Sequence, residues 1–245
     1  MAKLKVLGLN GSARRYGNTF RLLRVALLGA EDAGAETQLL HLYDYRVNPC
    51  RACYSDHYLE CHFPKKCPLY EGLDDFKQLA EKILESDAVI VATPVYWFNA
   101  SGVVKNLVDR MTSLENMIYH TGRSLLDGKV AGFIAVGEEA GAAMALSWLT
   151  LTFNMMGVHI PAWGTAYYHG KGDALENAQA VSDAYNVGVN VVAMTETLRG
   201  RREPRSPWYT FLPEETRNRI ASRVRKEAEE LKREEAEKRP WLGGL

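Results

Sequence analysis

Short continuous apolar runs alternate along the chain with longer segments in which apolar residues recur every three or four positions. Runs such as KVLGL at 5–9 and AVIVA at 88–92 are apolar at successive positions, which is typical of strands buried on both faces. The pattern predicts five strands, at residues 5–10, 37–42, 87–92, 129–136 and 158–166.

The segments between these runs have helical periodicity. They predict a helix that begins at Asn18 and ends near Gly29 to Gly34, and helices at residues 73–84, 102–117, 142–156 and 173–198. Strands that alternate with helices form right-handed βαβ units and a parallel sheet. We therefore expect an α/β, flavodoxin-like doubly wound fold whose five-stranded parallel sheet has the order 2-1-3-4-5.

Two parts of the chain fall outside this alternation. Residues 44–71 have no periodicity and form a cysteine-containing loop after the second strand, within a domain of residues 1–200. Residues 201–245 comprise a basic linker and a charged C-terminal helix with a narrow apolar stripe, formed by Ile220, Val224, Ala228 and Leu231. This pattern indicates either a solvated terminal helix or an oligomerisation arm that packs on another subunit.

Charge and composition narrow the classes of partner. Among the 245 residues, 30 basic side chains balance 30 acidic ones, which argues against a nucleic-acid partner. No unbroken apolar stretch reaches the roughly 18 residues of a membrane span, and the first residues lack the apolar core of a secretory signal. We expect a cytoplasmic protein, in which disulfides are not the default state of the four cysteines.

Residues 11–19, GSARRYGNT, lie between the first strand and the first helix. Open parallel sheets bind ligands beyond the carboxyl ends of their strands, and a helix N-terminus there favours an anion. Ser12, Asn18 and Thr19 can donate hydrogen bonds to phosphate, and Arg14 and Arg15 can add charge. The alternative is a polar helix cap without a ligand.

The loop after the third strand, TPVYWFNASG at 93–102, holds three consecutive aromatic residues. All three cannot enter one core face, so at least one should be exposed or cover a ligand; the alternative is packing beneath the loop. The segment 137–141 follows the fourth strand and suits a third loop at the same edge, or a plain turn. His169, after the fifth strand, is either a surface histidine or one that approaches a substrate.

Two of these segments resemble the NADPH-dependent FMN reductase branch of the flavodoxin-like superfamily. They are GSARRYGNT, and PVYWFNAS followed by VKNLVDR at 104–110. The resemblance implies that the FMN phosphate is held by Ser12, Arg14, Asn18 and Thr19, with Arg15 outside the shared pattern. It implies that the isoalloxazine ring is lined by Pro94, Val95, Tyr96, Trp97, Phe98 and Asn99. The third loop would contribute Gly137, Glu138 and Gly141, and the charges on the next helix would be scaffold or interface residues, namely Lys105, Asp109 and Arg110.

All four cysteines fall within 18 residues, as Cys50-x2-Cys53-x7-Cys61-x5-Cys67. Clustered thiolates bind zinc or an iron–sulfur cluster, and His57 and His62 offer further zinc ligands. The two ends of the pattern resemble the iron–sulfur flavoprotein branch, whereas seven residues stand in the middle where two are usual. A four-iron four-sulfur cluster, zinc and unliganded thiols all stay open.

The resemblance implies an FMN-dependent oxidoreductase that passes reducing equivalents from NAD(P)H to a quinone, a flavin or a similar acceptor. A second hypothesis is an electron carrier with FMN and a four-iron cluster, linked to ferredoxin. A third is a sensor or scaffold with a flavin site and no enzymatic activity. The family also implies a homodimer or homotetramer in which a neighbouring subunit covers the flavin.

Overall fold

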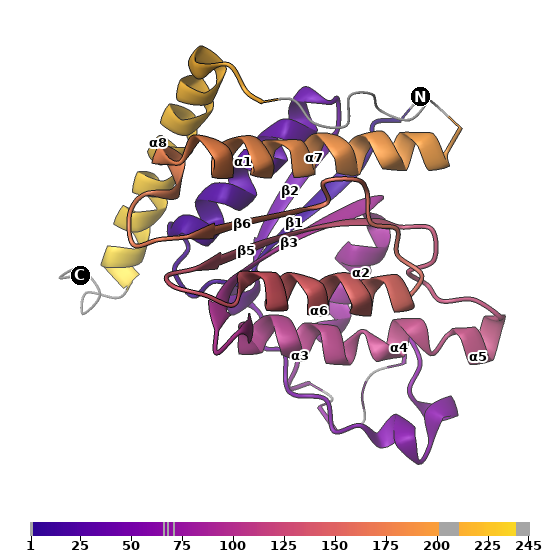
Figure 1. Ribbon diagram of the computed structural model, residues 1–245. Helices are drawn as coiled ribbons and strands as arrows, with labels where there is room; N and C mark the ends of the chain where they lie inside the picture. The colour runs from indigo at the N-terminus through magenta and orange to yellow at the C-terminus, as the bar shows by residue number, and fades with distance from the viewer. Residues whose placement is uncertain (1, 66, 68, 71, 201–210, 239–245) are drawn as a thin grey trace.

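Five parallel strands form one sheet in the order β2-β1-β3-β5-β6 in the computed structural model (Figure 1). Their bounds are Lys5–Asn10, Glu36–His41, Ala88–Tyr96, Val130–Gly137 and Thr165–His169 for β1, β2, β3, β5 and β6. The short strand β4, Asn99–Ala100, pairs antiparallel with the end of β3. The structure describes residues 2–65, 67, 69–70, 72–200 and 211–238. The predicted flavodoxin-like order of the main strands is confirmed.

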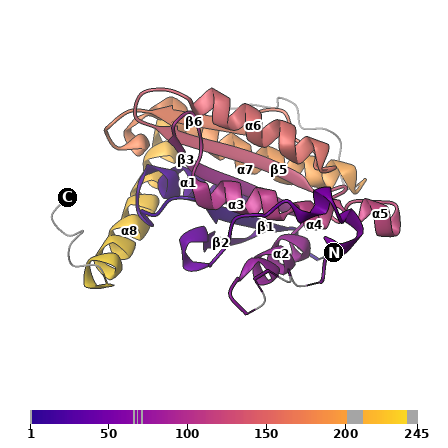
Figure 2. The ribbon, with the colours of Figure 1, turned by 90° about the horizontal axis from the view of Figure 1, so that it is seen from below.

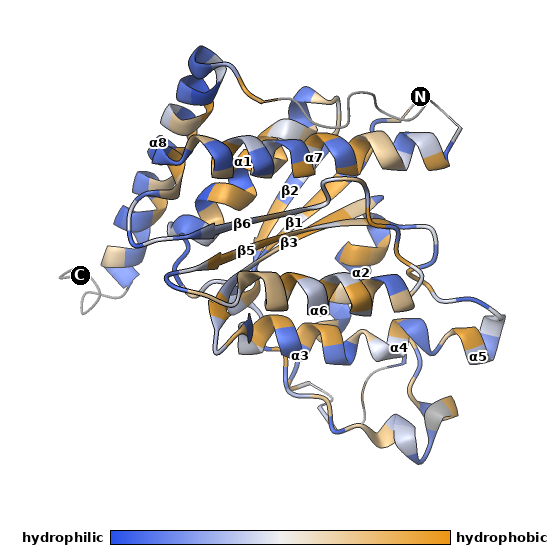
Figure 3. Ribbon diagram, in the orientation of Figure 1, coloured by the Kyte–Doolittle hydropathy of each residue, from blue (hydrophilic) through white to orange (hydrophobic). Residues whose placement is uncertain are grey.

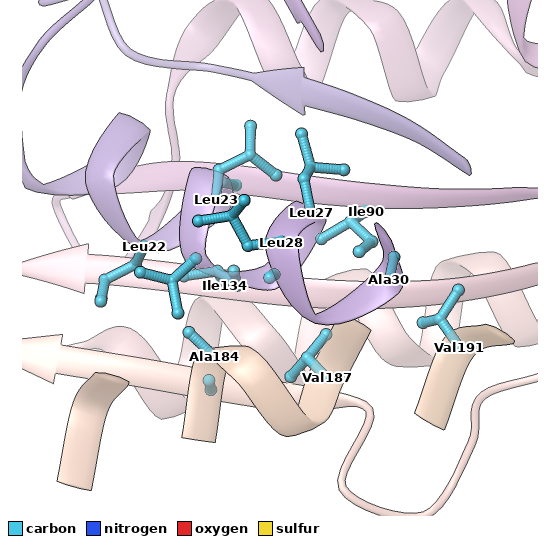
Figure 4. Packing of buried hydrophobic residues seen from close by; sticks show 14 of the residues in the cluster. Leu22, Leu23, Leu27, Leu28, Ala30, Ile90, Ile134, Ala184, Val187 and Val191 are labelled. Atoms are coloured by element: carbon cyan, nitrogen blue, oxygen red, sulfur yellow. The ribbon is translucent and has the colours of Figure 1, made fainter. Parts of the chain in front are cut away.

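Helices cover both faces of the sheet (Figures 1 and 2). Helices α1, Asn18–Asp32, and α7, Ala178–Leu198, lie on one face, where Leu23 and Val187 pack with Ile90 (Figure 4). The other face carries α2, Phe76–Glu85, α3, Gly102–Arg110, and α6, Ala142–Met155. Because the inner strands β1, β3 and β5 contribute to both apolar layers, they are apolar at successive positions (Figure 3).

The fifth main strand lies later than predicted. It covers Thr165–His169, whereas the apolar run predicted residues 158–166. Only a single bridge, from Val130 to His159, joins the earlier part to the sheet. Pro161 follows, and the main chain turns there as Gly164 N donates to the Pro161 carbonyl at 3.0 Å. A proline offers no N–H to a ladder, so the apolar run is interrupted.

Two predicted helices are divided. The segment 102–117 gives α3, then α4, Thr112–Glu115, and α5, Ile118–Thr121. The segment 173–198 opens with a 3₁₀ turn, η4, Ala174–Glu176, before α7. Each element has its own N-terminal cap. Asp173 accepts from Leu175 N at 2.9 Å at the start of η4, and Asn177 accepts from Ala180 N at 2.9 Å at the start of α7. Within the described ranges, no helix has the length and apolar character to cross a membrane.

The C-terminal helix α8, Glu214–Lys238, packs on α1 and α7 of its own chain (Figure 1). The apolar stripe of α8 is buried there through Ile220, Val224 and Ala228, against helices of the same chain. Ion pairs border this contact: Arg24 of α1 lies 2.6 Å from Glu227. Most of the predicted basic linker, residues 201–210, lies outside the described residues.

Helices α1 and α7 approach each other backbone to backbone. A Cβ atom at Gly188 of α7 would lie 1.8 Å from the carbonyl oxygen of Ala26, and one at Gly29 would lie 2.3 Å from that of Tyr185. No side chain fits at either position, so glycine is required by the close approach rather than by its backbone freedom.

We predict that Gly188→Ala destabilises the protein. Alanine improves helix propensity by about 1 kcal/mol. The clash with Ala26 forces the helices apart and outweighs this gain, for a net loss of about 2 kcal/mol or more. Urea unfolding measures the change. Gly102→Ala, at a helical position with open space around the new Cβ, is the control and should be neutral or stabilising. Equal midpoints for Gly188→Ala and wild type would contradict the packing described.

Candidate functional site

The carboxyl ends of β1 and β3 hold two loops tightly together. Gly11 N donates to the Ala92 carbonyl at 2.7 Å, and Ser101 Oγ donates to the Gly11 carbonyl at 2.7 Å. A Cβ at Gly11 would lie 2.3 Å from Val104 Cγ2. The loop before α1 and the loop before α3 therefore form one rigid edge of the site.

The loop of residues 11–17 turns so that the start of α1 is left open. Ser12 N donates to Asn10 Oδ1 at 3.1 Å, and Ser12 Oγ accepts from Arg14 N at 3.1 Å. Helix α1 begins after its N-cap residue Gly17, which has no side chain to cap the first N–H groups. Ser12 and Thr19 are buried beside this helix end. Uncapped N–H groups with two hydroxyls fit a phosphate.

The Asn18 side chain, predicted to bind phosphate, forms hydrogen bonds with the loop after β6. Its Nδ2 donates to the Gly172 carbonyl at 2.8 Å, and its Oδ1 accepts from Ala174 N at 3.1 Å. The side chain thus links α1 to the loop after β6, and its main-chain N–H is the group that an anion at the helix end would meet. Arg14 is exposed at the same loop.

The aromatic residues after β3 form a two-residue hairpin turn. Tyr96 pairs with Asn99, and the residues between them, Trp97 and Phe98, have φ values of +48° and +65°. Such turns normally take Asn-Gly, so aromatic residues here are strained, as is common at ligand-binding loops. Trp97 is 94% exposed, which confirms that the three aromatics do not all enter the core.

The loops after β5 and β6 complete this edge. A Cβ at Gly141 would lie 2.8 Å from Phe98 Cα, so the third loop touches the hairpin. Glu138 forms an ion pair with Lys171 at 2.7 Å, and His169 Nε2 accepts from Ala142 N at 3.3 Å. An open hollow of about 340 Å³ lies between the hairpin and the third loop, lined by Val95, Trp97, Phe98, Glu138, Glu139 and Ala140.

These loops bring the predicted flavin residues to one edge of the sheet. The phosphate loop lies at the start of α1, and Pro94 to Asn99 and Gly137 to Gly141 lie at the ends of the neighbouring strands β3 and β5. The open N-terminus of α1 suits a phosphate, and the hollow beside Trp97 and Phe98 at the same sheet edge suits a flat ring. FMN has both of these groups.

A buried histidine beneath the phosphate loop had no signal in the sequence. Asn10 Oδ1 accepts a hydrogen bond from Ser12 N, which fixes the orientation of the amide. Asn10 Nδ2 therefore points to His41 Nδ1, 2.9 Å away. His41 Nδ1 must therefore accept and carry no proton. Burial, and then the charge of Arg15, lower the pKa of His41 to about 4. Neutral His41 orients Asn10, which in turn holds the loop.

All four cysteines line a single cavity of about 270 Å³. They are free thiols, and burial followed by the neighbouring thiols Cys53, Cys50 and Cys67 raises the pKa of Cys61 to about 11. His57 and His62 line the same cavity. Among the residues that the structure describes, no three His, Cys, Asp or Glu side chains are grouped as ligands of a single metal ion.

A buried ion pair closes the neck of the cysteine loop. Arg110 lies 2.6 Å from Asp74, with 7% and 5% of the two side chains exposed. Asp74 also accepts from Asn48 N at 3.0 Å, and Arg110 donates to the Asn48 carbonyl at 3.3 Å. The Arg110 guanidinium lies over the Phe76 ring, 4.7 Å from its centroid. Arg110 thus joins both ends of the loop, whereas Lys105 and Asp109 pair with each other on the surface of α3.

We predict that stability decreases as the pH is lowered through the range in which His41 takes up a proton only in the unfolded state. The folded pKa is about 4 and the ordinary value is 6.5, so the stabilisation is complete above pH 6.5 and is lost as the pH falls toward 4. This difference corresponds to about 3 kcal/mol. Urea unfolding from pH 7 to pH 4 measures it.

His41→Asn is the matched variant, because it keeps an acceptor near Nδ1 and does not titrate. Its free energy of unfolding should change less than that of the wild type across this range. A variant with the same pH dependence as the wild type would show that His41 is not the group responsible.

Comparisons with known proteins identify the family to which the chain belongs. The model of a family described as NADPH-dependent FMN reductase matches residues 4–170. An iron-sulfur flavoprotein of Methanocaldococcus jannaschii is 29% identical over 209 residues, covering 80% of this chain and 100% of that protein. An iron-sulfur flavoprotein of Archaeoglobus fulgidus is 35% identical over 138 residues, and this chain spans only 56% of that relative's length.

Among solved structures, that of RosB with the bound intermediate 8-demethyl-8-formylriboflavin-5'-phosphate superposes with a TM-score of 0.67. The identity is 21%, and the match covers 91% of this chain and 87% of that one, so this likeness shows the fold. The family match itself spans more than half of the chain and includes the loops after β1, β3 and β5. This chain therefore belongs to the NADPH-dependent FMN reductase family.

Proposed function

We propose that the chain binds FMN at this sheet edge and passes reducing equivalents from NAD(P)H to a quinone, a free flavin or a similar small acceptor. The observation that carries the proposal is the uncapped start of α1 beside an aromatic hollow. Bound there, FMN supplies the hydride and electron transfer, since the hard chemistry in such proteins belongs to the cofactor.

The residues of the chain bind and orient the ligand in this proposal. Ser12, Thr19 and the first N–H groups of α1 hold the phosphate, and Arg14 adds charge from the exposed side of the loop. The hairpin of Trp97 and Phe98 and the third loop border the ring and limit the access of water. Hydride transfer needs no acid or base from the protein, and we assign none.

A second candidate is an iron–sulfur flavoprotein that carries electrons, with ferredoxin as a partner. Its support is the single cavity shared by Cys50, Cys53, Cys61 and Cys67, together with the names of the relatives that match. Four thiolates arranged around one cavity are the usual ligands of a four-iron four-sulfur cluster, which exchanges single electrons. The positive charge of Arg110 on the cavity wall would offset the charge of the thiolates.

We also propose a homodimer or homotetramer. Helix α6 has no charged residue, and its outer face exposes Met144, Leu151 and Met155. Uncharged apolar helix faces are more often covered by another chain than left in water.

We predict that Ser12→Ala combined with Thr19→Val weakens FMN binding. Each hydroxyl would donate a charge-assisted hydrogen bond to phosphate worth about 1.5–3 kcal/mol, so the Kd should rise by at least about tenfold. Quenching of flavin fluorescence measures the Kd. Thr197→Val at the far end of α7 is the matched control and should bind as the wild type does.

Wild-type FMN affinity in the double variant would refute the placement of the phosphate. Steady-state oxidation of NADPH then separates the first two candidates, since an electron carrier with FMN would not turn over nicotinamide. A wild-type protein that takes up no FMN would favour a sensor or scaffold.

We predict that anaerobically purified protein contains about four irons per chain and absorbs broadly beneath the flavin bands. Cys61→Ser should lose the iron and keep FMN, because the cysteine cavity and the phosphate loop use different residues. Ser113→Ala changes the wall of the same cavity without removing a thiol, and should keep the iron. Zinc without broad absorption would make the site structural, and no metal would leave four free thiols.

A further inference from the structure

One buried polar atom stands out at the phosphate loop. Of the buried side-chain nitrogen and oxygen atoms in the described residues, Arg15 Nε is the one without a hydrogen-bond partner. A buried donor that is left unsatisfied costs about 1–3 kcal/mol, so native proteins rarely retain one without a reason. Arg15 lies three positions before α1, inside the loop that faces the open helix end.

Two carboxylates, of Asp44 and Glu235, lie near the Arg15 guanidinium. Its NH1 lies 3.2 Å from Asp44 Oδ1, at the end of the segment that follows β2. Its Nε lies 3.9 Å from Glu235 Oε1 of α8, which is too long for a hydrogen bond. Two carboxylates from separate elements thus lie beside the guanidinium, of which NH1 donates to Asp44 while Nε has no hydrogen-bond partner among the described residues.

The position of Glu235 is itself unusual, because its side chain is only 8% exposed on a helix otherwise dominated by solvated charges. Helix α8 is fixed close to the start of α1 by a second contact, in which Asp173 pairs with Arg21 of α1 at 2.8 Å and with Arg225 of α8 at 2.9 Å. The C-terminal helix therefore lies against the phosphate loop as well as against the core.

We propose that Arg15 is a further phosphate-binding residue, whose guanidinium donates to the FMN phosphate at the start of α1 and is balanced by Asp44 and Glu235 when no phosphate is bound. A guanidinium is suited to this, because its planar fork binds phosphate oxygens in pairs. The assignment rests on the proposed binding of FMN. It adds a residue outside the motif shared with the family, and its partner Glu235 lies outside the residues that the family model matches.

Arg15→Gln tests this assignment by comparing two flavins that differ only in the phosphate. The Kd for FMN should rise about tenfold to a hundredfold, as expected for a lost charge-assisted hydrogen bond, and the Kd for riboflavin should stay the same. Arg15→Lys keeps the charge without the fork and should recover part of the loss. Arg223→Gln, on α8 near Glu31 at the opposite end of α1, removes the same charge and should change neither Kd.

An Arg15→Gln protein that binds FMN as tightly as the wild type would overturn the assignment, and Arg15 would then only brace α8. Equal weakening of FMN and riboflavin would also overturn it, because the change would lie in the fold. If Arg15→Gln does not fold, the ratio of the two Kd values in Arg15→Lys decides. Failure of the wild type to bind FMN at all would instead refute the proposed function.

Discussion

The contact between α1 and α7 determines where the candidate flavin site can form. The two helices touch through main-chain atoms at Gly29 and Gly188, so their separation is fixed by backbone dimensions and not by adjustable side chains. Helix α1 starts at the phosphate loop, and α7 follows the loop after β6. Near the start of α1, Asn18 bonds to Gly172 and Ala174 in the segment that leads into α7, so a second contact links the two helices.

Helix α3 ties the flavin edge to the cysteine cavity. Its N-terminal neighbour Ser101 bonds the phosphate loop through the Gly11 carbonyl, and its last residue, Arg110, closes the neck of the cysteine loop. The nine residues of α3 span about 13 Å at 1.5 Å per residue. Helix α3 therefore contacts the phosphate loop near its first turn and the cysteine loop at its last residue.

Sequence patterns predicted the sheet well because its strands are buried on both faces, which leaves unbroken apolar runs such as AVIVA at 88–92. They placed the last strand too early because Pro161 and the turn at Gly164 interrupt an otherwise apolar segment. Side-chain hydrogen bonds between residues far apart in the sequence could not be predicted. The Asn18 side chain bonds residues 154 and 156 positions away, and His41 gains its role from Asn10 on a neighbouring strand. Local periodicity contains no information about such partners.

The unusual spacing of the cysteines also has a physical explanation in the fold. Two short 3₁₀ turns, η2, Cys53–Ser55, and η3, Tyr58–Glu60, occupy most of the chain between Cys53 and Cys61. His57 N donates to the Cys53 carbonyl and Glu60 N to the His57 carbonyl, each at 3.0 Å, so the segment folds back on itself. Cys61 therefore returns to the cavity beside Cys53, and Asn116 Nδ2 holds its carbonyl at 3.1 Å. Because the turns take up the extra residues, the longer middle spacing still leaves all four cysteines lining the same cavity.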